Sequence, residues 1–508
     1  MALSVTEYQQ CDATALAGLI RNGEVSADEV LQTCIALIEE LNPALNAVIH
    51  KLYDDARSRL GALPPDAPFA GVPLLLKDLG HHLAGAPQTS GNAALRDCRR
   101  TSDRSSYFVE KLAAAGFVFP GKTNVPEFGL KPTTEPEAFG PSRNPWNLHR
   151  TPGGSSGGSA AMVAAGVVPL ATANDGGGSI RIPASYCGLV GLKPSRGVVS
   201  NGPHYAELWD GLNADLVVSR TVRDTAAVLD RVAGNMPGDP YAGPVLDAGN
   251  PGRCASWLAA PRALRVALDI RPLIDVPVQH SAVAATESMA RLLEGLGHTV
   301  EEARPAISGQ QVMSAFSAVY MSAAAADFHE VQGVAGRSAA RRGTEADTRF
   351  LAYMGDCLTG AQYAAARREI NQINRAFGTF YRDYDVYLTP TTVGTAHELG
   401  ALNTSPALRL AQGVIRALRL GRLVLHSGLL ETSFREAAAR VPYTQLANLS
   451  GLPSISLPLF RDERDGLPVG VMLTAALGND GLLLQVARQL EMAHPWISHY
   501  PFAAGPGG

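Results

Sequence analysis

Two glycine-rich segments carry serines that could act as nucleophiles. Residues 153–159 read GGSSGGS and residues 175–183 read DGGGSIRIP, which place Ser155 and Ser179 in loops of little side-chain bulk. Glycines leave backbone N–H groups open to a developing oxyanion. Upstream, Lys77 ends the apolar run FAGVPLLLKD, so its amine is drawn inward. Because burial disfavours the charged form, such a lysine can serve as the general base for a serine.

The serine pair at 155–156 has two other interpretations. A glycine–serine run is typical of flexible linkers. Here the small apolar residues SAAMVAAGVVPLATA follow it, which predicts a buried helix, a buried strand and therefore a packed loop. The letters GGSSG also match the G-x-S-x-G turn of α/β-hydrolases, with Ser155 as the nucleophile. No strong helix-forming run follows that turn directly, so the spelling alone does not establish a Ser-His-Asp site.

Phosphate and metal binding are both disfavoured. GFVFPGKT at 116–123 fits the phosphate-loop pattern, but its apolar residues read as a strand. Pro126 would interrupt the helix that such a loop has to open. His81 and His82 are adjacent instead of being spaced like metal ligands, and no HExxH motif occurs. We therefore expect no metal and no other cofactor.

The composition is that of a globular protein, with 46% hydrophobic and 18% charged residues in 508. The formal net charge of -4 gives no electrostatic footprint for nucleic acid or for an anionic membrane. The six cysteines are dispersed without a CxxC pair, which favours a reduced compartment. The start MALSVTEYQQCDA lacks the features of a signal peptide. We expect a cytoplasmic protein that binds neither nucleic acid nor membrane.

The elements that must position the candidate residues alternate between helix and strand. The stretch SADEVLQTCIALIEELN has helical periodicity, with Ser26 as N-cap and Glu29 completing a capping box. Amphipathic patterns predict further helices at 105–116 and 480–491, and a helix followed by a strand at 286–303. Short apolar runs predict buried strands at 69–78, 262–270, 385–390 and 453–459. This alternation predicts an α/β architecture.

Beyond these patterns, the sequence resembles the amidase signature family. GGSSGGSAAMVAAGVVPLATANDGGGSIRIPASYCGLVGLKPSRG looks like the family signature, with GVPLLLKD and GKTNVPEF upstream in the usual order. PYTQLANLSGLPSISLPL and GLPVGVMLTAALGNDGLLLQVARQLE extend the resemblance over nearly the whole chain. TTEPEAFGPSRNPWNL and ARQLEMAHPW are most similar to the 6-aminohexanoate-cyclic-dimer hydrolases of the family.

The resemblance implies one α/β/α domain over residues 1–508, with a mixed central β-sheet flanked by helices. Within it, residues 1–65 form an N-terminal helical segment, residues 70–215 the catalytic core, and residues about 310–430 a variable substrate pocket. In that last region FSAVYMSAAAADFH (316–329) reads as a helix beside the pocket. Its Tyr320 is a candidate substrate contact, with a core tyrosine as the alternative.

The resemblance also implies a Ser–cis-Ser–Lys triad. By position, Ser179 is the nucleophile that forms the acyl-enzyme, and Lys77 is the base. Ser155 follows a cis peptide bond after Gly154 and relays the proton between them. The neighbouring Ser156 is expected to make a loop hydrogen bond.

The same resemblance assigns the residues around Ser179. The oxyanion hole comprises the backbone N–H groups of Gly176, Gly177, Gly178 and Ser179, and the charged pair that braces their loop is formed by Asp175 and Arg181. Two positions depart from the family pattern. Gly176 stands where a larger side chain is frequent, which predicts a looser loop, and Met472 stands where glutamine is common. These departures bear on substrate preference.

The expected activity is hydrolysis of amide C–N bonds through an acyl-enzyme, with a small-molecule amide as the partner. Cyclic or linear oligoamides and carbamates, as for a urethanase, fit this chemistry, and a homodimer is the assembly left open. One alternative is the glutaminase subunit of a tRNA-dependent amidotransferase, which would need partner chains. The other is a non-catalytic binding scaffold, against which the presence of all three triad residues argues.

Overall fold

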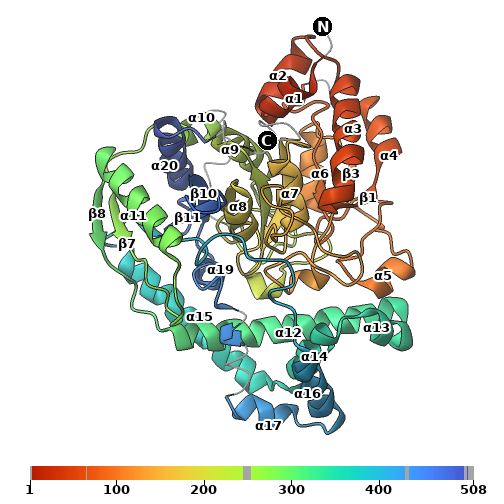
Figure 1. Ribbon diagram of the computed structural model, residues 1–508, viewed down its shortest axis with the longest axis vertical. Coiled ribbons are helices and arrows are strands. Elements are labelled where there is room, and N and C mark those ends of the chain that lie inside the picture. The colour runs from red at the N-terminus through yellow and green to blue at the C-terminus, as the bar shows by residue number, and fades with distance from the viewer. Residues whose placement is uncertain are drawn as a thin grey trace.

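A mixed eight-stranded sheet lies at the centre of the computed structural model, which describes residues 3–64, 66–243, 253–428, 434–436, 438–496 and 500 (Figure 1). Its strands, in order across the sheet, are β4 (Leu170–Asp175), β6 (Ala214–Ser219), β5 (Val190–Lys193), β10 (Ser454–Arg461), β11 (Pro468–Ala475), β9 (Val386–Pro390), β7 (Arg265–Leu268) and β8 (Thr299–Glu302). Neighbours from β4 to β9 are antiparallel, whereas β9, β7 and β8 run parallel. The prediction of an α/β fold with a mixed central sheet is therefore confirmed.

A second, three-stranded sheet positions Lys77. It has the order β1 (Val48–Lys51), β3 (Gly121–Thr123) and β2 (Leu76–Lys77). The run 69–78 was expected to be one strand, but only Leu76 and Lys77 pair as such. The residues before them make single bridges, among them Leu75 to Ala171 of β4. That bridge sets the end of β2 beside the central sheet.

The N-terminal segment is mostly helical, and it also contributes β1 to the three-stranded sheet. It comprises α1 (Val5–Gln10), α2 (Ala13–Arg21), α3 (Ala27–Leu45) and α4 (Tyr53–Leu60), which gather at one end of the molecule (Figure 1). The capping box of Ser26 and Glu29 is confirmed, because each side chain bonds the other's backbone N–H. Two short helices follow, α5 (Ala93–Asp97) and α6 (Tyr107–Ala114).

Helices cover both faces of the central sheet. One face of β10 carries Ile455, Leu457 and Leu459, which join the main hydrophobic core with residues of α9 (Val222–Val232), α11 (His280–Gly295) and α20 (Asp480–Ala493). The other face packs against α7 (Gly157–Ala164) and α8 (Arg181–Cys187). Every residue of α7 and α8 is buried, and the small side chains of GGSAAMVA allow that close approach. Helix α10 (Arg253–Trp257) lies beside α20 and α9.

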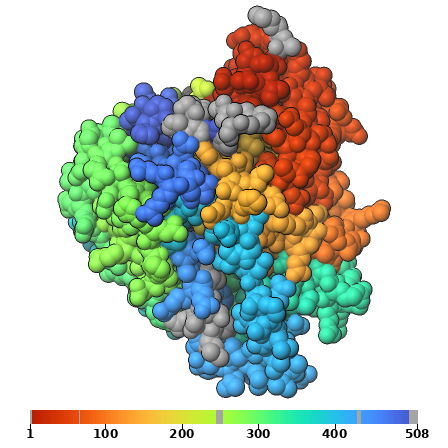
Figure 2. Space-filling view, viewed as in Figure 1, coloured from red at the N-terminus to blue at the C-terminus, as the bar shows by residue number. Residues whose placement is uncertain are grey.

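The region of about 310–430 is mostly helical. It contains α12 (Gly309–Ala335), α13 (Arg337–Gly343), α14 (Ala346–Cys357), α15 (Gly360–Phe380), α16 (Pro406–Ala417) and α17 (Gly421–His426), and α19 (Gln445–Ser450) follows. In Figure 1 the long α12 crosses beneath the centre of the molecule, with α14, α16 and α17 below it. Figure 2 shows the segment near residue 400 lying against the orange part of the chain, where Arg150 bridges Glu398.

Candidate active site

Lys77 lies at the centre of a buried polar cluster. Its Nζ donates hydrogen bonds to Ser155 Oγ at 2.8 Å, to Ser156 Oγ at 2.8 Å and to Asn174 Oδ1 at 2.5 Å. The side chain is fully buried, and this burial lowers the pKa of Lys77 to about 7, although Asp215 and Asp175 oppose the shift. A neutral amine is therefore accessible near neutral pH.

The end of β4 holds this lysine in place. Thr172 and Asn174 point to the same face of the strand, as residues two apart do. Thr172 Oγ1 accepts a hydrogen bond from the backbone N–H of Lys77 at 2.7 Å, and Asn174 Nδ2 donates to the carbonyl of Leu79 at 2.8 Å. His81 Nδ1 lies 2.7 Å from the same Thr172 hydroxyl. Sequence reasoning missed these supports, and the only signal for them was the alternation of polar residues in LATAND.

Ser155 lies in a loop that leaves no room for side chains beside it. The Gly154–Ser155 peptide bond is cis. A Cβ on Gly154 would come within 2.5 Å of the carbonyl oxygen of Thr133, and one on Gly129 within 3.1 Å of Ser155 Oγ. The buried helix predicted after this loop is confirmed as α7, and it begins directly at Gly157, although no strong helix-forming run follows the serine pair. Glycine is a poor helix former, but the burial of the whole helix overrides that propensity.

Ser179 lies where two cavities meet. The inner cavity has a volume of about 60 Å³, and its lining includes both Ser155 and Ser179. The outer chamber is larger, about 1170 Å³, and its lining includes Ser179, Trp209, Phe316 and Tyr320. Within the described part of the chain the Ser179 hydroxyl makes no hydrogen bond, so it is unengaged at the junction. A nucleophile–base hydrogen bond is often long before substrate binds.

The loop amides around Ser179 are not equivalent. The N–H of Gly178 donates to Asp175 Oδ1 at 2.6 Å and is therefore already engaged. The N–H groups of Gly176, Gly177 and Ser179 have no acceptor among the residues that the structure describes. Of the four amides that the resemblance assigned to the oxyanion hole, three are thus open to an incoming oxygen in this geometry.

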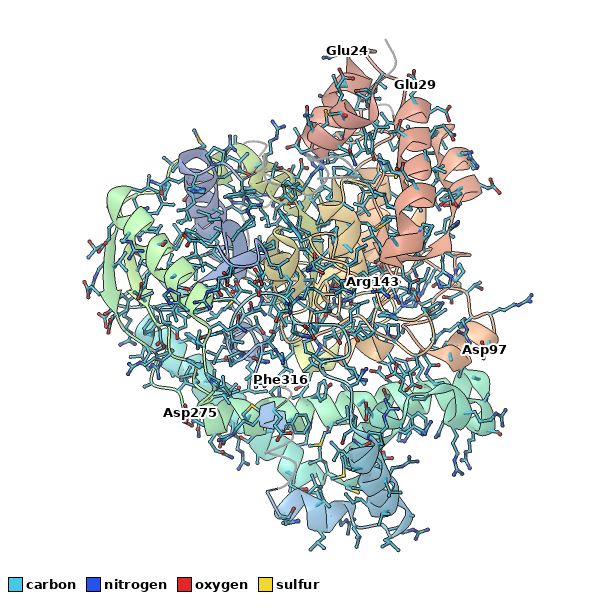
Figure 3. The ribbon with its side chains drawn as sticks, in the orientation of Figure 1. Glu24, Glu29, Asp97, Arg143, Asp275 and Phe316 are labelled. Atoms are coloured by element: carbon cyan, nitrogen blue, oxygen red, sulfur yellow. The ribbon has the colours of Figure 1, made fainter. Side chains whose placement is uncertain are left out.

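The rings of Trp209 and Phe316 pack against this loop. A Cβ on Gly176 would lie 2.9 Å from Trp209 Cε3, and one on Gly177 would lie 2.9 Å from Phe316 Cζ. Figure 3 labels Phe316 on α12, on the side of the helix that faces the loop. Thr444 adds a hydrogen bond from its hydroxyl to the Gly177 carbonyl at 2.7 Å. The place of the missing side chain at Gly176 is taken by the indole of Trp209.

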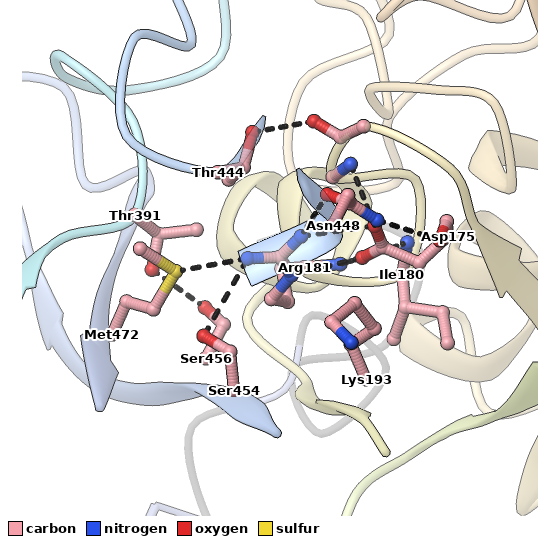
Figure 4. Close-up of polar contacts among 12 residues, drawn as sticks. Asp175, Ile180, Arg181, Lys193, Thr391, Thr444, Asn448, Ser454, Ser456 and Met472 are labelled. Carbon is pink, nitrogen blue, oxygen red and sulfur yellow. Dashed lines mark hydrogen bonds and ion pairs between the residues drawn. The ribbon is translucent and has the colours of Figure 1, made fainter. Parts of the chain in front are cut away.

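A buried ion pair closes the loop at its base. Arg181 Nε and Nη2 each donate to a different oxygen of Asp175 at 2.9 Å (Figure 4). Burial alone would raise the pKa of Asp175, but the charge of Arg181 and its hydrogen bonds hold that pKa at about 2. Asn448 lies in the segment PYTQLANLS but was not among the predicted site residues; it accepts from Arg181 Nη2 at 2.7 Å and donates to Asp175 Oδ1 at 2.8 Å. Both ends of the loop 176–180 are therefore held by one hydrogen-bond network.

Met472 belongs to this network and not to either cavity. Among the residues that the structure describes, Arg181 Nη1 has only weak acceptors, the sulfur of Met472 at 3.4 Å and the hydroxyl of Ser454 at 3.5 Å. The Met472 side chain is buried and clusters with Val393 and Tyr443. This departure from the family pattern thus changes the support of the loop, and the lining of the pocket is not affected directly.

Tyr320 forms part of the wall of the outer chamber. Its ring lies edge-on to Trp209 at 5.5 Å and stacks with Phe316 at 5.7 Å between centroids. Its hydroxyl donates to the carbonyl of Leu130. The residue is therefore both a chamber wall and a member of a packed aromatic cluster, with its polar atom already satisfied.

The residues 116–123, which match the phosphate-loop pattern, have a structural role instead. Lys122 lies in β3, fully buried, with its Nζ 3.0 Å from Asp78 Oδ1 and 2.5 Å from Gln88 Oε1. These internal contacts leave the Lys122 amine unable to bind a phosphate.

Across the described ranges, no group of three or more His, Cys, Asp or Glu side chains is arranged to hold a metal ion. The same ranges contain no helix with the length and apolar character needed to cross a bilayer.

Comparison with known proteins agrees with this geometry. The family model described as Amidase matches residues 29–484. A 6-aminohexanoate-cyclic-dimer hydrolase from Pseudomonas sp. (strain NK87) is 39% identical over 503 residues, which cover 97% of each chain. The solved structure of a 6-aminohexanoate cyclic dimer hydrolase complexed with substrate has a TM-score of 0.87 at 37% identity, covering 97% of this chain and 99% of that chain. A bacterial aryl acylamidase reaches 0.84 at 28% identity, covering 98% and 99%.

The fold and these full-length relatives define a hydrolase that acts on carbon–nitrogen bonds. The chain belongs to the amidase signature family, and the resemblance seen in the sequence is confirmed.

Proposed function

We propose that the protein hydrolyses amides of apolar acids through an acyl-enzyme on Ser179. The observation that carries this is the 2.8 Å contact between Lys77 Nζ and Ser155 Oγ, in a site where burial brings the lysine pKa to about 7. A neutral lysine amine is a competent base, and Ser155 shares the inner cavity with Ser179. The proposed roles are base for Lys77, relay for Ser155 and nucleophile for Ser179.

In the proposed reaction Lys77 takes the proton of Ser155 as Ser155 takes that of Ser179. The Ser179 oxygen bonds the carbonyl carbon, and the oxyanion is stabilised by the amides of Gly176, Gly177 and Ser179. The tetrahedral intermediate collapses with cleavage of the C–N bond, and the relayed proton leaves with the amine. Water, deprotonated through the same relay, then cleaves the ester and frees the acid.

The outer chamber supports an apolar acyl group. Among its lining residues are Phe316, Tyr320, Phe350, Leu351 and Phe434, and burying an apolar chain against such side chains is favourable. The relatives are named for hydrolysis of 6-aminohexanoate cyclic dimer and of aryl acylamides. We therefore propose linear or cyclic oligoamides as the substrate class. Carbamates present the same carbonyl, which makes a urethanase activity a natural extension.

The alternatives fit the site less well. The solved structure of a glutamyl-tRNA(Gln) amidotransferase component from Thermotoga maritima resembles this chain with a TM-score of 0.70 at 26% identity. A glutaminase needs polar groups for a small amino acid, whereas the chamber next to Ser179 is large and mainly apolar. A binding scaffold would have no need for a buried lysine among serine hydroxyls. One amidase domain over residues 1–508 remains our proposal, supported by a core that unites Leu16 of α2 with Leu490 of α20.

A labelling and turnover experiment tests the proposal. A fluorophosphonate probe should label Ser179, as located by peptide mass spectrometry, and Ser179→Ala should remain unlabelled. Hydrolysis should then be compared for an apolar oligoamide, an anilide, a carbamate and free glutamine. We expect turnover of the apolar substrates and little of glutamine. Preferred turnover of glutamine, or labelling at another residue, would overturn the proposal.

A further inference from the structure

Helix α12 forms a wall of both cavities that meet at Ser179. Phe316 and Tyr320 line the outer chamber, and Asp327 and Val331 line the inner cavity. The spacings of four, seven and four residues keep all of them on one face of the helix. With a rise of about 1.5 Å per residue, Asp327 lies roughly 10 Å further along the axis than Tyr320. The helix thus presents an aromatic stretch to one cavity and an acidic stretch to the other.

One carboxylate in the lining of the inner cavity has no partner among the described residues. Arg100 and Glu330 form an ion pair at 2.7 Å, and Tyr205 donates to Glu330 at 3.5 Å. Asp327 makes no hydrogen bond or ion pair with any residue that the structure describes. Since Arg100 and Glu330 balance each other, the carboxylate of Asp327 is left as the excess charge of this lining.

No histidine supplies the missing cation. His82 lines the same cavity, and burial lowers its pKa to about 2, with the neighbouring His204 acting in the same direction. The pKa of His204 is itself lowered by burial. Both rings are therefore neutral near pH 7. Burial and the charge of Glu330 raise the pKa of Asp327 to about 7, which means that the protein itself does not compensate its ionised form.

We propose that the inner cavity is the subsite for the amine portion of the substrate, and that Asp327 binds a protonated nitrogen in it. This inference rests on the proposed function. The ligand class is an aliphatic amine with a second, cationic nitrogen, so the favoured substrates are monoacylated diamines. An ammonium ion supplies the charge that Asp327 lacks, and a charge-assisted hydrogen bond in a partly desolvated site is among the stronger polar contacts. The smaller volume of this cavity restricts the amine to a short chain.

A matched substrate pair tests the inference in the active enzyme. One substrate is an apolar acid joined to a short diamine, and the other is its isostere with a terminal methyl group in place of the ammonium. We expect Asp327→Asn to lower the kcat/KM ratio of the cationic to the neutral substrate by about tenfold or more. Asp356→Asn, on the surface of α14, makes the same change in net charge outside both cavities and should leave the ratio unchanged. An unaltered ratio in Asp327→Asn would overturn the inference.

A binding measurement separates this inference from the proposed chemistry. Calorimetric titration of Ser179→Ala with a short alkyl diamine requires no turnover. We expect binding to weaken about tenfold or more when Asp327→Asn is added. Equal affinity in the two proteins would refute the subsite even if amides are hydrolysed. A loss of diamine binding on Asp327→Asn in a protein that hydrolyses no amide would instead refute the proposed function alone.

Discussion

Asp175 and Arg181 form a fully buried ion pair across the loop that carries Ser179. Arg181 Nε lies 2.9 Å from Asp175 Oδ2, and Arg181 Nη2 lies 2.9 Å from Asp175 Oδ1. The aspartate ends β4 and the arginine begins α8, so the five residues between them are fixed at both ends. The position of Ser179, the proposed nucleophile, therefore depends on a contact that takes no part in the proposed reaction.

Arg181→Lys should weaken both folding and turnover. Lysine cannot reproduce the planar fork, and a buried pair that loses its geometry costs about 3–5 kcal/mol of unfolding free energy. Denaturant unfolding and kcat measure the two effects. Arg223→Lys is the matched control, because the Arg223 side chain that pairs with Asp12 is 44% exposed and the change there should cost roughly 1 kcal/mol or less. Equal effects of the two substitutions would contradict the bracing role.

Ser179→Ala should abolish acyl-enzyme formation without unfolding the protein. The hydroxyl is free of hydrogen bonds among the described residues, so its removal leaves no buried partner unsatisfied. Mass spectrometry with a slow substrate should show an acyl adduct on the wild-type protein and none on the variant. An adduct on any other residue would refute the assignment.

Activity should rise with pH through about 7. Burial lowers the pKa of Lys77 from 10.5 to about 7, and only the neutral amine accepts a proton. A pH profile of kcat/KM should therefore show an acid limb at about pH 7, and Lys77→Met should remove most of the rate. A variant with full activity at neutral pH would place the base elsewhere.

The same shift predicts how stability depends on pH. Between about pH 7 and 10.5 the unfolded chain holds a proton on Lys77 that the folded chain lacks. The contribution of Lys77 to the unfolding free energy therefore increases as pH rises across that window, because the unfolded state binds more protons than the folded state. The unfolding free energy of the wild-type protein minus that of Lys77→Met should therefore increase from pH 7 to pH 10. A constant difference would contradict a lowered pKa.

Ser155→Ala and Ser156→Ala should differ, although both hydroxyls lie 2.8 Å from Lys77 Nζ. Ser155 lines the inner cavity with Ser179, whereas Ser156 is fully buried and also lies 3.4 Å from the carbonyl of Asn174. We expect Ser155→Ala to lose about 10²–10⁴-fold in kcat, and Ser156→Ala to lose less. Adding Lys77→Met to Ser155→Ala should cost little more, because coupled residues act as a unit. The reverse ranking would assign the relay to Ser156.

Met472→Gln should stabilise the fold by about 0.5–1.5 kcal/mol. The amide oxygen of glutamine is a better acceptor than a thioether sulfur, and Arg181 Nη1 has no strong partner at present. Unfolding in denaturant measures the change. Met472→Leu, which keeps the volume but removes the acceptor, should be neutral or slightly destabilising. A glutamine variant less stable than the leucine variant would contradict this view of the network.

Sequence patterns predicted the parts of the molecule that depend on local chemistry. Examples are the capping box at Ser26 and the two glycine-rich loops that carry serines. The residues that support the site could not be predicted in this way. Asn448 reaches Asp175 from α19, and Trp209 reaches Gly176 from a single helical turn, contacts that join segments far apart in the chain. The segment PYTQLANLS around Asn448 resembles the family, but nothing in it marks Asn448 as the supporting residue, and the residues around Trp209 carry no such signal.

Local propensity alone was an incomplete guide in two places. The run ending at Lys77 is apolar enough for a long strand, yet only two residues pair, because β3 is short and the rest of the run makes single bridges. The glycines at 157 and 158 weaken the helical signal, but their lack of side chains is what allows α7 to approach Asn124 and Thr134. In both cases tertiary packing decided the outcome.

The side chains of β4 point alternately to its two faces, and this limits which insertions and deletions the sequence can accept there. Asn174 faces the lysine and Asp175 faces the arginine because successive side chains of a strand point to opposite sides. An insertion or deletion of one residue there would exchange the two faces and bring a carboxylate to Lys77. The lysine would then hold its proton at neutral pH, and the proposed base would be lost although Lys77, Ser155 and Ser179 were all still present. The length of this strand is therefore as strict a requirement for activity as the identity of the triad.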